Sequence, residues 1–193
     1  MTSVQLEELL KEILRSYWRQ RIAVRLFKLS TIQHSSVQTI EYIGIPELGF
    51  ATGFLSQEAT QAALDSVEKN LNERLPQDLF IALLAKFESF LAQALVLQGS
   101  TVSGPLGVLQ TAVQNHYSVP SSVIDRLDEV RERRNILIHH DGRINAKYSA
   151  AAQKVIFQPW VEDPTSLSII AISPEYLTYV VDTIVTYARH VIP

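Results

Sequence analysis

The sequence predicts an all-α protein: a helical bundle of about four to six helices with one long loop and at most one small β-hairpin. Apolar residues recur at three- and four-residue spacing over most of the chain, which is the period of an amphipathic helix. Of the 193 residues, 47% are hydrophobic and 19% are charged, so the chain can bury a sizeable core. No internal repeat or linker divides it, and we therefore expect a single domain over residues 1–193.

The first helix is expected over residues 3–28. Thr2 and Gln5 stand at the spacing of a capping box, in which the two side chains satisfy backbone N–H groups at a helix start. From residue 30 to residue 56, glycine and proline interrupt short β-branched runs. This composition indicates a long connection that holds at most a short strand, and loops of this length are often functional.

Two further helices are expected next, over 56–74 and over 76–98, with Pro76 suited to the first turn of the second. The second carries a wide apolar stripe of Phe80, Leu83, Leu84, Phe87, Leu91 and Ala94, typical of a core helix. Glu88 flanks this stripe. It is a candidate partner for Arg134, or alternatively an exposed acid on the helix rim.

Residues 105–116 read as a short helix, followed by a helix that begins at Ser122, with Asp125 at capping-box spacing. Asp141-Gly142 is typical of a helix end. Two apolar runs within residues 155–172 predict a β-hairpin or an extended flap. A last helix is expected to begin with Ser173 as its cap, with inward-facing residues Leu177, Val180, Val181, Ile184, Ala188 and Val191.

The helix from Ser122 poses a question about Arg134. On an ideal wheel, with about 100° per residue, Arg134 falls in the middle of an apolar stripe. The stripe consists of Val123, Leu127, Val130, Leu137 and Ile138. A buried guanidinium stays charged, so it requires an anion or carbonyl partner. His139 lies about 140° away on a straight helix, although a last turn can unwind.

Basic residues gather between Arg131 and Lys147. The segment holds Arg131, Arg133, Arg134, Arg143 and Lys147 against two acids, Glu132 and Asp141, in a chain of net charge −3. This local excess indicates a small anionic footprint rather than a long nucleic-acid track. The residues expected to bind the anion are Arg131, Arg143, Lys147 and His140. The alternative is a solvated helix end, where basic residues also suit the helix dipole.

Arg134-Asn135 followed by His139, with the tail HDGRINAKY and the start of the last helix, resembles the HEPN superfamily of small all-α proteins. The resemblance covers the C-terminal half, whereas the N-terminal half agrees only in helical pattern. It implies a metal-independent endoribonuclease acting as a toxin, in defence or in RNA processing, with two motifs meeting across a homodimer axis. Some members of the superfamily are non-catalytic, so a dimerisation or regulatory module is the alternative.

One reaction suits an arginine and a histidine: attack of an RNA 2′-hydroxyl on its adjacent phosphate. His139 would transfer protons, Arg134 would hold the phosphate oxygens, and Asn135 would position the histidine or the phosphate. The resemblance implies 2′,3′-cyclic phosphate and 5′-hydroxyl products. No cofactor and no metal are expected, because His139, His140 and Asp141 are the only clustered ligands and adjacent histidines diverge on a helix.

The expected partners are RNA, a second copy of the chain, and a separate antitoxin or regulatory protein. Some related toxins carry a tyrosine two residues after the histidine. Asp141 stands there instead, which argues against regulation by nucleotidylation. The N-terminus is amphipathic and acidic, and no apolar stretch approaches about 20 residues, so we expect no membrane association and a cytoplasmic location. The chain has no cysteine and hence no thiolate chemistry.

Overall fold

A computed structural model describes residues 1–33, 39–42 and 53–192 and is mostly helical, which confirms the all-α prediction. The elements are α1 (Ser3–Gln33), β1 (Thr39–Tyr42), β2 (Gly53–Ser56), α2 (Gln57–Lys69), the π-helix η2 (Asn70–Arg74), α3 (Leu75–Leu97), α4 (Leu106–Gln114), α5 (Ser121–His139), α6 (Ala146–Lys154) and α7 (Pro174–Val191). If the run from α2 through η2 to α3 is counted once, the described residues contain six helical segments, within the expected range.

The chain forms two compact units. The motif unit consists of Met1–Leu14 with Leu75–Pro193, and the hairpin unit consists of Arg15–Arg74. Helix α1 therefore contributes its first turns to one unit and the remainder to the other. The single domain expected over the whole chain stays a prediction.

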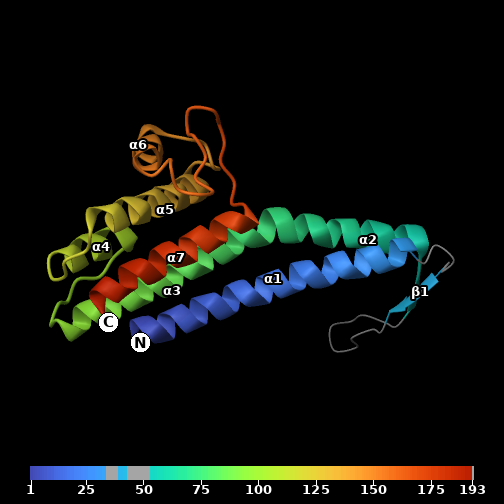
Figure 1. Cartoon of the computed structure of the whole chain (residues 1–193), viewed down its shortest axis with the longest axis horizontal. Helices are drawn as coiled ribbons and strands as arrows, with labels where there is room; N and C mark the ends of the chain where they lie inside the picture. The colour runs from blue at the N-terminus through green and yellow to red at the C-terminus, as the bar shows by residue number, and fades with distance from the viewer. Residues whose placement is uncertain (34–38, 43–52, 193) are drawn as a thin grey trace. The chain divides into compact units, whose positions relative to one another are not determined.

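The core of the motif unit lies between α3 and α7, which pack along each other (Figure 1). The ring of Phe80 lies 5.9 Å from that of Tyr176, and the ring of Phe87 lies 5.6 Å from that of Tyr187. Because both positions advance together, the two helices run in the same direction. All inward positions expected on these two helices are buried, so the apolar spacing was interpreted correctly.

Three predicted helix starts are confirmed. The N–H of Thr2 donates to Gln5 Oε1 at 2.9 Å, and the N–H of Gln5 donates to Thr2 Oγ1 at 3.2 Å, which is a reciprocal capping box. Ser56 caps α2 and Ser173 caps α7, each accepting from the N–H three residues on. The first helix continues beyond the expected end at residue 28, to Gln33.

The capping box expected at Ser122 is wrong. Helix α5 begins one residue earlier, after Pro120, and has no side-chain cap. Asp125 instead accepts a hydrogen bond from Lys154 of α6 at 2.9 Å.

Of the two alternatives expected over residues 155–172, a β-hairpin or an extended flap, the hairpin is wrong. This segment contains no strand and forms one isolated bridge, between Arg143 and Ile169. Pro159 and Pro164 lack the N–H that a strand ladder needs. Several apolar side chains of the segment, such as Val161, are still buried, although the backbone forms no strand.

The hairpin unit contains the β-hairpin that the structure does show. Strands β1 and β2 pair antiparallel, from Thr39 opposite Ser56 to Tyr42 opposite Gly53. A short strand was expected within the 30–56 connection. The described residues of this connection form the end of α1, up to Gln33, and the two strands β1 and β2. The residues between the two strands lie outside the described chain.

One helical run of the described chain, Glu58–Leu97, is long and apolar enough to meet the criteria for a membrane span. Of its most apolar window, 44% is buried inside the protein. Core helices of soluble proteins meet the same criteria, so the run is weak evidence for a membrane.

Candidate functional site

The buried arginine of α5 is Arg133, and the prediction that Arg134 faces the core is wrong. Arg133 is completely buried, whereas the side chain of Arg134 is 21% exposed. The ideal stripe fails in the last turns, where Ile138 is 43% exposed and Ile136 is buried in its place. Helices α6 and α7 cover α5 on the side of Glu129, Arg133 and Ile136, which the spacing of apolar residues alone did not reveal.

Arg133 lies in a buried polar network. Its Nε donates to Glu129 at 2.9 Å, and its Nη2 donates to Tyr148 and Glu162, each at 2.8 Å. Its guanidinium lies 3.7 Å from the ring centre of Tyr176, whose hydroxyl donates to Glu129 at 2.7 Å. Burial raises the pKa of Glu129, and Arg133 and the tyrosine hydroxyls oppose that rise. The network ties α5 to α6, α7 and the 155–172 segment.

The end of α5 determines where the two histidines lie. The Ile136 carbonyl accepts hydrogen bonds from the N–H groups of His140 and Gly142, both at 2.9 Å. Asp141 and Gly142 have φ of 49° and 74°, so the chain leaves the helix in the left-handed conformation. His139 is the last helical residue and His140 is its cap, and both are exposed. The predicted helix end is confirmed.

A pocket of about 540 Å³ lies at this helix end, which we call the motif pocket. The start of α4, the last turns of α5 and the start of α6 line it. Six of the seven residues predicted for the site are in its lining: Arg131, Arg134, Asn135, His139, His140 and Lys147. The seventh, Arg143, is exposed, does not line the pocket and belongs to the backbone bridge with Ile169.

Glu88 pairs with Arg134, as one reading of the sequence expected. Their closest atoms, Arg134 Nη1 and Glu88 Oε1, are 3.3 Å apart, and each side chain is 21% exposed. The same Glu88 oxygen accepts from the N–H of Leu106, the first residue of α4, at 3.0 Å. A carboxylate thus occupies the positive end of a helix beside an arginine, where an anion is stabilised. The Nε of Arg134 is buried and has no hydrogen-bond partner in the described part of the chain.

Arg131 is held by its neighbours. Its Nη1 donates to Gln110 at 2.7 Å and lies 2.9 Å from Asp128, while its Nε donates to Glu132 at 3.1 Å. Glu132 also accepts from the amide of Asn135 at 3.3 Å. Arg131 therefore forms a wall of the pocket, and its charge is already balanced by carboxylates.

The histidines and Lys147 differ from Arg131. The side chains of His139, His140 and Lys147 have no hydrogen bond or ion pair within the described ranges, and all three residues are exposed. They are the groups of the motif pocket that an incoming anion can reach without first displacing a partner.

Two contributions to the pocket were missed from the sequence. Helix α4 contributes its N-terminus, with Leu106 and Gly107. This contribution could not be predicted without knowing how α4 packs in the tertiary fold. Helix α6 brings its cap, Asn145, whose Oδ1 accepts from the N–H of Tyr148 at 3.0 Å. An asparagine immediately before a helical stretch is a common capping signal and was recognisable. Both helix starts favour a negative charge in the pocket.

The described ranges contain no group of three or more His, Asp or Glu residues that could hold a metal ion. No protein-family model, curated protein or solved structure matches the chain. The lining carries three cations, Arg131, Arg134 and Lys147, against Glu132, with Glu88 and Asp128 paired to the two arginines. The arrangement offers hydrogen-bond donors to a phosphate and an imidazole for proton transfer.

Proposed function

We propose that the chain is a metal-independent endoribonuclease whose active site is the motif pocket. The observation that carries the proposal is the presence of Arg134, Asn135 and His139 in the lining of one pocket, together with His140 and Lys147. Its volume of about 540 Å³ falls within the usual range for small-ligand sites, about 300–1,000 Å³, and suits a short single-stranded segment.

The proposed reaction uses a nucleophile that the substrate carries. The RNA 2′-oxygen attacks the adjacent phosphorus, the 2′-proton passes to a base, and the bond to the 5′-oxygen of the next nucleotide breaks as that oxygen gains a proton. His139 transfers protons, because an imidazole can both accept and donate a proton. Arg134 and the helix starts stabilise the negative charge on the phosphate oxygens. The products are 2′,3′-cyclic phosphate and 5′-hydroxyl ends.

A homodimer is part of the proposal and rests on the resemblance to the HEPN superfamily. The separate geometric reason for sharing the site between chains no longer applies, since Arg134 and His139 already line one pocket of a single chain. The test mixes two variants, Arg134→Ala and His139→Ala, after confirming that each is inactive alone and that their subunits exchange. A heterodimer of the two keeps one Arg134 and one His139, on opposite chains. Partial recovery of cleavage supports a shared site, and full activity of a stable monomer contradicts it.

The second candidate is a non-catalytic dimerisation or regulatory module. The ion pairs favour it, because Arg134 is paired with Glu88 and Arg131 with Asp128 and Glu132. In this reading the two arginines hold α3, α4 and α5 together and take no part in chemistry.

Cleavage of total RNA by the purified chain in EDTA separates the two candidates, with the ends of the fragments identified chemically. We expect cleavage that His139→Ala and Arg134→Ala each abolish while the melting temperature is retained. His140→Ala is the matched control, an adjacent histidine in the same pocket, and is expected to matter less. If His140→Ala alone abolishes cleavage, the proton-transfer assignment is wrong. Failure of the wild-type chain to cleave any RNA supports the non-catalytic module.

The proposed biological setting is the cytoplasm, in a toxin, defence or RNA-processing role with a separate antitoxin or regulatory protein. Induced expression tests the toxin role. Growth arrest by the wild-type chain, relieved by His139→Ala, supports it, whereas equal growth with both chains contradicts it.

A further inference from the structure

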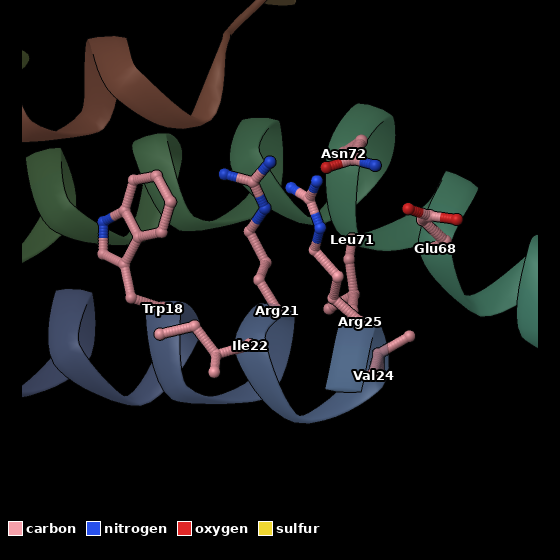
Figure 2. Close-up of a pocket in the computed structure, with 8 residues that line it drawn as sticks. All are labelled: Trp18, Arg21, Ile22, Val24, Arg25, Glu68, Leu71 and Asn72. Atoms are coloured by element: carbon pink, nitrogen blue, oxygen red, sulfur yellow. The ribbon is translucent and has the colours of Figure 1, made fainter. Parts of the chain in front are cut away.

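The hairpin unit contains a second pocket, of about 140 Å³, between α1 and the α2–η2 run. We call it the tryptophan pocket. Its chemically active lining comes from Trp18, Arg21 and Arg25 of α1 and from Glu68 and Asn72 on the opposite wall. Figure 2 shows both guanidinium groups directed from α1 toward the helix that carries Asn72.

Aromatic contacts hold Arg21 in position. Its guanidinium carbon lies 4.7 Å from the ring centre of Trp18 and 5.8 Å from that of Tyr17. The hydroxyl of Tyr17 is buried and donates to the carbonyl of Leu71 at 2.7 Å. Leu71 belongs to η2, where the hydrogen-bond pattern departs from that of an α-helix, and such π-turns frequently occur at functional sites. The two walls of the tryptophan pocket are therefore tied together at its base.

The acid of the pocket is already engaged. Lys28 Nζ lies 2.6 Å from Glu68 Oε2 and 2.8 Å from Asp65 Oδ1. Lys28 thus offsets the charge of Glu68 from the side. Arg25 follows Arg21 by four residues, so the two guanidiniums share one face of α1 and bring positive charge to the same wall of the pocket.

We propose that the tryptophan pocket binds a phosphate group through Arg21, Arg25 and the side-chain amide of Asn72. The planar fork of arginine matches phosphate oxygens, and an amide adds further donors. A volume of about 140 Å³ is below the range usual for drug-sized ligands, so the pocket admits a single group rather than a nucleoside. The phosphate comes either from a free phosphate or from the backbone of a nucleic acid. The proposal stands independently of the activity proposed for the motif pocket.

The chain provides a local probe, because its only tryptophans are Trp18 and Trp160 and the latter is exposed. In a Trp160→Phe background the fluorescence reports Trp18 alone. The full-length protein is titrated with inorganic phosphate at constant ionic strength, with chloride as the reference. A parallel titration uses a short oligodeoxynucleotide that has no terminal phosphate and cannot undergo 2′-hydroxyl attack. A change with inorganic phosphate identifies the free anion as the ligand, and a change with the oligodeoxynucleotide alone identifies a backbone phosphate.

The expected result is a saturable change in Trp18 emission that Arg25→Gln weakens by about tenfold or more, since hydrogen bonds to charged groups are strong. Arg19→Gln is the matched control, an exposed arginine on α1 outside the lining, and is expected to leave the affinity unchanged. If Trp160→Phe disturbs the helical circular dichroism spectrum, the indole N–H resonance of Trp18 in the wild-type chain replaces the fluorescence. The proposal is overturned if neither titrant changes the Trp18 signal, or if the change is undiminished in Arg25→Gln.

Discussion

Replacing Arg133 by methionine tests the buried network most directly. Arg133 and Glu129 are both completely buried, and the substitution leaves the Glu129 carboxylate without its cation. Breaking one side of a buried ion pair costs about 3–5 kcal/mol. The hydroxyls of Tyr148 and Tyr176 still donate to Glu129, so we expect the lower part of that range, about 3 kcal/mol. For a chain of this length that loss lowers the melting temperature by about 6–12 °C.

The adjacent residue provides the control. Arg134→Met removes one ion pair, with Glu88, in which both side chains are 21% exposed. Such a pair contributes about 1 kcal/mol or less. Thermal and urea unfolding followed by circular dichroism at pH 7 compare the two variants. Equal losses, or a loss below about 1 kcal/mol for Arg133→Met, would refute the assignment of Arg133 as the structural arginine.

The double variant that combines Arg133→Met with Glu129→Gln adds a further check on the same pair. Glu129→Gln alone removes the carboxylate and leaves Arg133 with Glu162, which is 38% exposed. If the two residues interact directly, the double variant loses less stability than the sum of the single variants, by about 1–3 kcal/mol. Additive losses would show that each residue acts through other neighbours.

Three other perturbations have defined outcomes. Burial raises the pKa of Tyr187 to about 12. Its contribution to stability is therefore complete below pH about 10 and is lost as the pH rises from about 10 toward 12. Over this pH range the melting temperature should fall less in Tyr187→Phe than in the wild-type chain. Gly142→Ala would place a Cβ 2.5 Å from the Ile170 carbonyl oxygen at φ 74°, so urea unfolding should show a larger loss than for Gly99→Ala, which has φ 72° and open space. Glu88→Gln keeps an oxygen that can accept from the Leu106 N–H at the start of α4, but removes the negative charge. The affinity of the motif pocket for a 2′-deoxy dinucleotide, measured by calorimetry, should therefore rise by roughly fivefold. A fall in affinity would contradict the role of Glu88 as a competing anion.

The helix starts and the core faces of α3 and α7 were predictable because their signals are local. A capping residue and its partner lie three positions apart, as at Thr2 and Ser173, and a wide buried face repeats at the helical period. The face of α5 was not predictable in this way. A helical wheel does not show which side of a helix its neighbours cover. Because Leu137 and Ile138 are apolar, the predicted apolar stripe was centred near Arg134. The spacing of Glu129 and Arg133, four residues apart, was the signal that pointed to the buried pair.

The same distinction applies to the motif pocket. Its α5 and α6 residues are close in sequence, from Arg131 to Lys147, so a single basic segment indicated nearly all of them. The contribution of α4 depends on how that helix packs against α5, which no short-range pattern encodes. Glu88 was expected from the sequence as one of two alternatives, and the structure shows it paired with Arg134. Arg143 was included on charge alone. Its backbone forms the bridge with Ile169, and its side chain does not line the pocket.

The irregular segment between α6 and α7 has a practical consequence for anyone altering this protein. Because the segment has no regular secondary structure, it could be chosen as a site for inserting an epitope or for a deletion. Its residues nevertheless make several hydrogen bonds and an ion pair with other parts of the motif unit. Glu162 pairs with Arg133, the Ile170 N–H donates to the Gly142 carbonyl at 2.9 Å, and the Ile144 N–H donates to Ser168 at 3.2 Å. A deletion here would uncover the interior beneath the helix that carries the two histidines. The segment therefore functions as a fixed part of the scaffold and is unsuited to grafting.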